Sequence, residues 1–187
     1  ATMPIMPLPN VTTADQLLVL RDPPWRHELW RGELRRMSPA GHDHGDVALR
    51  LGIAIGTHVR NRRLGKVYAA ETGFVLARDP DTVLAPDVAF VQRDRLPPKD
   101  SPGFFPGAPD LAVEVLSPDD SRSATSKKVA AWLAHGAREV WVVDPKRRTL
   151  TLHTAHAAPR TLAHEATLRE SAVLPGFTLA LAELFDD

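Results

Sequence analysis

The spacing of apolar residues along the chain predicts helices and strands in alternation. Apolar side chains recur at three- and four-residue intervals in two stretches, which predicts one helix from residue 43 or 44 to about 61 and another within 117–136. Continuous or alternating apolar runs predict five strands, which cover 67–76, 88–91, 111–116, 140–143 and 150–153. Because a helix separates the third and fourth of these strands, we expect a crossover between a parallel pair.

The N-terminal part of the chain is organised differently. Residues 1–24 form a proline-rich arm followed by a short helix over 13–20. Two short strands hinged at Arg31-Gly32 predict a hairpin over 27–37.

Proline and glycine also mark a long connection in the middle of the chain. Residues 93–109 hold five prolines and two glycines, which is typical of a loop or lid. The tail ends in a predicted closing helix over 179–185. We therefore expect one α/β domain over residues 1–187, with a mixed sheet flanked by helices and an N-terminal hairpin.

Composition narrows the classes of protein to which this sequence can belong. Hydrophobic residues make up 43% and charged residues 25%, which is ordinary for a globular domain. The absence of cysteine excludes disulfide scaffolds, thiolate zinc sites, iron–sulfur clusters and cysteine nucleophiles. The 23 cationic and 23 acidic side chains cancel, so any binding to nucleic acid must use a local basic patch. Without an apolar run of about 18 residues or a signal-peptide pattern, we expect a soluble, cytoplasmic protein that does not enter a membrane.

One charged residue lies inside an apolar strand. Glu114 interrupts the run 111–116, which is expected to be buried on both faces. A buried carboxylate is costly unless it is paired or binds a metal. Glu114 is therefore a candidate site residue, with a structural ion pair as the alternative.

A second carboxylate opens the preceding strand. Asp87 follows Pro86 and stands at the start of 88–91. Three other Pro-Asp pairs occur in the chain, so turn chemistry alone could explain this one. Neighbouring strands can place two carboxylates side by side, however. Two hard oxygen donors and a backbone carbonyl are ligands that suit Mg²⁺.

The helix after Glu114 carries a lysine at an unusual position. Only five of the 23 cationic residues are lysines. At 100° per residue, Lys128 lies about 40° from Trp132 on the apolar stripe, whereas Lys127 lies about 140° away and should face solvent. Lys128 is thus a candidate for a cation near the core, and a lysine whose stem merely covers the core edge is the alternative.

Several blocks of this sequence resemble the Uma-two family. The two longest blocks are 110–118 and 136–145, with Lys128 between them. Shorter blocks cover 28–34, 37–39, 72–74 and 86–90, together with His44. The blocks occur in the family's order over residues 25 to 180. Because this family is placed among the PD-(D/E)xK nucleases, the resemblance implies a restriction-endonuclease-like fold and a metal-dependent phosphodiesterase.

The resemblance implies roles for the matching residues. Asp87 aligns with the aspartate of the "PD" element and Glu114 with the second acidic residue. These carboxylates and the carbonyl of Val115 would hold Mg²⁺ or Mn²⁺. The superfamily places its lysine two residues after the acid, where this chain has Leu116. A lysine on the following helix takes that place in the Uma-two family, and here it aligns with Lys128.

Three further residues are weaker candidates for the same site. Glu33 and Glu71 could supply another acidic group, although both could be surface residues. His44 is a candidate by family resemblance, although a histidine at a helix start needs no such role.

We therefore expect a magnesium-dependent endonuclease that acts on nucleic acid, with DNA favoured over RNA. The candidates for contacts to backbone phosphates are the cations of the long helix and its end, Arg50, Arg60, Arg62, Arg63 and Lys66. A solvated helix end with charges that complement the helix dipole is the alternative. A homodimer would supply two sites for two DNA strands. Two other functions stay open, a nucleic-acid-binding module without turnover and a metal-dependent hydrolase of small phosphoesters.

Overall fold

The structure, a computed structural model, describes residues 10–21, 25–118 and 120–186. The proline-rich stretch expected before residue 10 lies outside these residues. The helices are α1 (Ala14–Val19), α2 (His42–Arg62), α3 (Arg122–Ala134) and α4 (Ala182–Phe185), with a 3₁₀ turn at Arg93–Arg95. The first strands are β1 (Arg26–Trp30), β2 (Glu33–Met37), β3 (Gly65–Ala69), β4 (Phe74–Ala77), β5 (Thr82–Leu84) and β6 (Val88–Gln92). The later strands are β7 (Phe105–Pro106), β8 (Leu111–Val115), β9 (Glu139–Asp144), β10 (Thr149–His153), β11 (Arg160–Leu162), β12 (Thr167–Leu168) and β13 (Leu179–Ala180).

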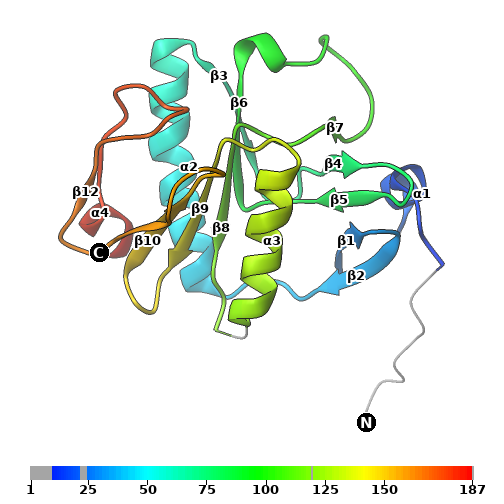
Figure 1. Cartoon of the computed structure of the whole chain (residues 1–187), viewed down its shortest axis with the longest axis horizontal. Coiled ribbons are helices and arrows are strands. Elements are labelled where there is room, and N and C mark those ends of the chain that lie inside the picture. The colour runs from blue at the N-terminus through cyan, green and yellow to red at the C-terminus, as the bar shows by residue number, and fades with distance from the viewer. Residues whose placement is uncertain (1–9, 22–24, 119, 187) are drawn as a thin grey trace.

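A six-stranded mixed sheet forms the centre of the molecule, in the order β11-β10-β9-β8-β6-β3 (Figure 1). The parallel pair is β8 and β9, and α3 connects them, which confirms the predicted crossover. The fully buried β8 and β9 fit their nearly continuous apolar sequences.

A smaller sheet, in the order β2-β1-β5-β4-β7, lies beside the larger one (Figure 1). The predicted hairpin is β1–β2, and its two-residue turn has positive φ at both Arg31 and Gly32. This geometry matches the twist of the flanking strands.

The single strand predicted over 67–76 was wrong. The chain breaks there into β3 and β4, which belong to different sheets. Glu71 adopts a positive φ of 72°, which ends strand geometry. Gly73 then packs so tightly that a Cβ there would lie 2.4 Å from the Phe104 ring. Strand β5, which opens immediately after the predicted turn at 79–81, was also not expected from the sequence.

Helices α2 and α3 cover opposite faces of the six-stranded sheet (Figure 1). The apolar stripe of α2, from Val47 to Val59, packs with Phe90, Val113 and the C-terminal segments. On the other face, Val129 and Trp132 of α3 pack against Ala112 and the aromatic residues of the smaller sheet. None of the helices in the described part of the chain is long and apolar enough to span a membrane.

The ends of three elements, β6, β8 and α2, meet at one place in the fold. Strands β6 and β8 run antiparallel, with Val88 opposite Val113, so the start of β6 lies beside the end of β8. The first turn of α2 reaches the same place, because His44 contacts Asp87 just before β6. The register of the pair, continued by one position, sets Asp87 opposite Glu114.

Candidate active site

Glu114 lies on the face of β8 that packs against α3, since side chains alternate along a strand and Ala112 belongs to that core. Its side chain is buried and accepts two hydrogen bonds. The indole N–H of Trp132 donates to Oε1 at 2.8 Å, and the ammonium of Lys128 donates to Oε2 at 3.3 Å. The carboxylate is therefore buried with partners, as the cost of burying a charge requires.

Lys128 connects two carboxylates that come from different sheets. Its Nζ lies 3.3 Å from Oε2 of Glu114 and 3.0 Å from Oε1 of Glu28. The helical geometry that set Lys128 beside the core stripe holds, because Lys127 is exposed and Lys128 is half-buried. The site thus contains a lysine close to Glu114, although the position two residues after Glu114 is occupied by Leu116.

Glu28 is a member of this cluster that sequence reasoning missed. It lies on β1, and its side chain is only 4% exposed. Its Oε1 also accepts the backbone N–H of Ala85 at 3.1 Å, which ties the hairpin to the segment before Asp87. One signal could have found Glu28. Strand alternation places it on the same face as Trp30, which packs against the core between α3 and the sheets.

Asp87 is held just before the start of β6 by backbone and side-chain contacts. Its Oδ2 accepts the N–H of Val115 at 2.8 Å, and Nε2 of His44 lies 3.2 Å from the same oxygen. Both of these contacts are made at Oδ2. The N–H and the C=O of one strand residue point to the same side, and the carbonyl of Val115 therefore lies on the Asp87 side of β8.

These side chains line one cleft of about 690 Å³. Asp87, Glu114, Val115, His44 and Lys128 all contribute to its walls. Exposed cations stand at its edge, on the hairpin and on α3, namely Arg35 and Lys127. The arrangement is acidic and oxygen-rich inside and basic at the rim.

Burial and neighbouring charges shift the proton affinity of the cluster. Burial, together with the negative charges of Glu28 and Asp87, raises the pKa of Glu114 to about 7 against the opposing charge of Lys128. Burial alone would lower the pKa of Lys128, but the charges of Glu114 and Glu28 outweigh burial and raise that pKa. The hydrogen bond to Asp87 raises the pKa of His44 against the effect of its partial burial. Lys128 is accordingly a cation throughout the neutral range.

A family model described as "putative restriction endonuclease", Uma2, matches residues 14–182. That match includes the hairpin, Asp87, Glu114 and α3. The chain belongs to this family. No curated protein matches it.

One solved structure with the same fold is that of a "putative nuclease belonging to DUF820" from Anabaena variabilis ATCC 29413. The TM-score is 0.81 at 21% sequence identity, over 92% of this chain and 97% of that one. At this identity the likeness shows the fold, which is the restriction-endonuclease-like arrangement of a mixed sheet flanked by helices. The fold class and the Uma2 family expected from the sequence are both confirmed.

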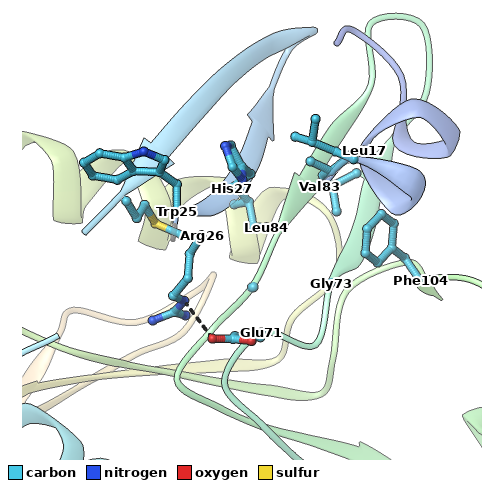
Figure 2. A pocket seen from close by; sticks show the side chains of 12 residues that line it. Leu17, Trp25, Arg26, His27, Glu71, Gly73, Val83, Leu84 and Phe104 are labelled. Atoms are coloured by element: carbon cyan, nitrogen blue, oxygen red, sulfur yellow. Dashed lines mark ion pairs between the residues drawn. The ribbon is translucent and has the colours of Figure 1, made fainter. Parts of the chain in front are cut away.

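The two weaker acidic candidates in this Uma2 chain, Glu33 and Glu71, do not line the cleft. Glu33 is exposed on β2 and pairs with Arg35 at 3.6 Å. Glu71 lies 3.7 Å from Nε of Arg26 in a separate pocket between α1 and the smaller sheet (Figure 2). Each of these carboxylates pairs with an arginine, and neither contributes to the wall of the cleft.

The predicted phosphate contacts are also away from the cleft. Arg60, Arg62, Arg63 and Lys66 are exposed around the C-terminal end of α2. His44 at the other end of α2 marks the cleft, and 16 residues at 1.5 Å per residue separate it from Arg60 by about 24 Å. Arg50 pairs with Asp46 at 2.8 Å and bonds to carbonyls of the C-terminal segment. The cations at the cleft are instead Arg26, Arg35, Lys127 and Lys128.

The donor set of the cleft fits a hard divalent cation. The described residues contain no group of three or more His, Cys, Asp or Glu side chains arranged to hold a metal ion. Asp87 and Glu114 with the carbonyl of Val115 would leave the remaining positions to water and substrate. Mg²⁺ binds proteins in this way, through one or two carboxylates with retained waters.

Proposed function

We propose that this Uma2 protein is a Mg²⁺- or Mn²⁺-dependent endonuclease that hydrolyses phosphodiester bonds in DNA. The observation that carries the proposal is the position of Lys128. Its ammonium lies 3.3 Å from Glu114 in the cleft that Asp87 also lines, so an acidic pair and a cation share one site. Nuclease chemistry needs this combination, because negative charge develops beside a bound metal during attack on a phosphate.

Asp87, Glu114 and the carbonyl of Val115 would hold the metal. When bound, Mg²⁺ would polarise the scissile phosphate and lower the pKa of a coordinated water. Val115 and His44 fix the Asp87 carboxylate through Oδ2, and Oδ1 would be the atom that binds the metal. Glu114 must release its proton for this role, and its pKa of about 7 allows that at neutral pH and above.

Lys128 would act as a hydrogen-bond donor and positive charge beside the attacking water. Its pKa is raised, so it keeps its proton and does not serve as the general base. Glu28 pairs with the same ammonium at 3.0 Å and thereby positions it beside Glu114. Leu116 packs against the core that contains Val129 and Trp132, so an apolar side chain occupies the position two residues after Glu114. Lys128 would supply the positive charge instead.

The cleft also offers a group for the phosphate backbone. Within the described residues, Nε of Arg26 is the one buried side-chain polar atom without a hydrogen bond, with Glu71 at 3.7 Å as its nearest ionic partner. Arg26 lines the cleft together with Arg35. Guanidinium groups bind phosphate oxygens in bidentate fashion, which favours a phosphodiester substrate. The cytoplasmic location expected from the sequence is part of this proposal.

A nuclease assay tests the proposal. Purified protein is incubated with plasmid DNA, with a matched RNA and with bis(p-nitrophenyl) phosphate, each with Mg²⁺, with Mn²⁺ and with EDTA. We expect metal-dependent cleavage of DNA that Asp87→Asn abolishes. Turnover of the small phosphodiester alone would favour the small-substrate hydrolase. Salt-dependent DNA binding without cleavage under any metal would favour the binding module.

A further inference from the structure

The outward face of α2 carries exposed apolar side chains between glycines. Leu49 is 62% exposed and Ile53 59% exposed, although both lie in the middle of a helix of 21 residues. Gly45, Gly52 and Gly56 share this face, since all five residues fall within an arc of about 100° at 100° per residue. We call this face, formed by Gly45, Leu49, Gly52, Ile53 and Gly56, the α2 stripe.

The glycines of the α2 stripe have no explanation within the described chain. A Cβ added at Gly45 or Gly56 would meet no atom within 4 Å, and one added at Gly52 would make an ordinary contact at 3.9 Å with Val88. None of the three has a positive φ. Glycine weakens a helix interior, so three of them on one face need a reason. Close approach of another backbone is the reason that remains, because glycine permits it.

A groove runs along the α2 stripe. It has a volume of about 790 Å³, lies between α2 and the edge strand β3, and extends from His44 and Asp87 to Arg60 and Asn61. Alanine and valine side chains, including Ala48 and Val67, form much of its wall. Exposed apolar surface beside a groove of this kind marks an interface.

We propose that the occupant of the α2 stripe is a second copy of this chain, packed with its own α2 antiparallel to the first. A two-fold axis between Gly52 and Ile53 pairs residues of the two copies so that the two residue numbers add up to 105. Leu49 of each copy then faces Gly56 of the other, and Ile53 faces Gly52. Each large side chain meets a glycine, so the surface is complementary to itself, as an isologous interface must be.

The charges at the two ends of α2 support this orientation. Asp43 and Asp46 stand in the first turns, and Arg60 stands in the last. Antiparallel packing brings Arg60 of each copy to Gly45 and Asp46 of the other, where Arg60 would join the ion pair that Asp46 forms with Arg50. Parallel packing would set like charges together. The charge pattern thus selects a two-fold dimer in which the ends of α2 attract.

The dimer sets two clefts at opposite ends of the paired helices. His44 of one copy would stand opposite position 61 of the other, which separates the two His44 positions by about 25 Å along the helix axis. The inference does not depend on the proposed chemistry, since it rests on the α2 stripe alone. Its tests accordingly measure assembly and not cleavage.

Sedimentation equilibrium of the full chain without metal or nucleic acid is the first test. We expect a dimer at micromolar concentration for the wild type and a monomer for Ile53→Lys, with the dissociation constant raised about tenfold or more. Val19→Lys is the matched control, because Val19 is an equally exposed apolar helix residue, on α1. It should leave the dimer intact. A monomeric wild type, or a dimer that Ile53→Lys does not weaken, would overturn the proposal.

Two further variants keep the test independent of folding. Gly56→Leu replaces glycine by a better helix former, so the monomer should melt at the same or a higher temperature while the dimer dissociates. Because the chain has no native cysteine, Ile53→Cys should form a disulfide-linked dimer under mild oxidation, and Val19→Cys should not. If Ile53→Lys left the assembly unchanged but altered affinity for DNA, the groove would be a nucleic-acid site and the dimer proposal would fail.

Discussion

Lys128 and Glu28 form an ion pair of 3.0 Å between a helix on the larger sheet and the first strand of the smaller one. Exactly 100 positions separate them in the chain, and the Glu28 side chain is almost fully buried. The hairpin is therefore part of the candidate active site and not an appendage to it. Glu28 and Glu114 share one ammonium, and the charge of Glu28 acts on the Glu114 carboxylate.

Replacement of Glu28 by glutamine should separate positioning from metal binding. In Glu28→Gln the amide oxygen can still accept the N–H of Ala85, so we expect the fold to persist. The charge of Glu28 contributes to the raised pKa of Glu114, and its loss should lower that pKa. The pH dependence of Mn²⁺ affinity should then move to lower pH, while cleavage falls because Lys128 loses one of its two anchors.

Glu33→Gln is the matched control for this change. Glu33 lies on the same hairpin but is exposed and contacts Arg35, outside the cleft. Titration of Mn²⁺ affinity against pH should give the wild-type curve. An unchanged curve for Glu28→Gln would mean that Glu28 does not act on Glu114.

Removal of the Lys128 charge should stop cleavage without removing the metal. Lys128→Met keeps the length of the side chain and deletes the donor. We expect cleavage to fall about 100-fold or more, which is the usual loss for a group that stabilises developing charge. Mn²⁺ should still bind, but at a higher pH than in the wild type, because the positive charge of Lys128 no longer lowers the pKa of Glu114.

Lys99→Met controls for the loss of a lysine at an exposed position that does not line the cleft. It should cleave DNA at the wild-type rate. Circular dichroism of both variants checks that each is folded. Wild-type cleavage by Lys128→Met would remove Lys128 from the mechanism.

The metal-free protein should lose stability as pH rises toward the pKa of Glu114. Glu114 has a pKa of about 7 in the fold, compared with 4.5 in an unfolded chain. Between these values the folded state holds a proton that the unfolded state has released. Stability therefore falls as pH rises from about 4.5 to about 7, by at most about 1.4 kcal/mol per pH unit, and levels off above.

Glu114→Gln should abolish this component of the pH dependence. Urea unfolding of both proteins in EDTA, from about pH 5 to about pH 8, measures the difference. The variant should be at least as stable as the wild type at the upper end, because one of three neighbouring carboxylates is gone, and it should bind Mn²⁺ more weakly. A large loss of stability at all pH values would instead identify Glu114 as a structural ion-pair partner.

The sequence was informative where one residue contradicted its surroundings. Glu114 stands inside an apolar strand, and helical spacing directed Lys128 along the core edge, so both could be predicted from local pattern alone. Asp87 needed the additional inference that its strand lies beside that of Glu114, which the antiparallel register of β6 and β8 bears out.

The rest depends on long-range packing that no local pattern contains. Glu28 enters the cluster only because the smaller sheet folds against α3, and nothing near it in the sequence indicates a lysine 100 positions away. Four of the five cations expected to contact phosphates lie at or just beyond the end of α2 opposite the cleft, because the helix is 21 residues long; they are Arg60, Arg62, Arg63 and Lys66. The single strand expected over 67–76 failed because Glu71 turns the backbone between two sheets.

Anomalous diffraction from crystals soaked in Mn²⁺ tests the central claim most directly, namely that Asp87 and Glu114 hold one divalent cation together. The account predicts a peak within about 2.5 Å of an oxygen of each carboxylate and of the carbonyl of Val115, absent in Asp87→Asn crystals treated in the same way. A peak elsewhere in the chain, or no peak at saturating Mn²⁺ above the Glu114 transition, would contradict it.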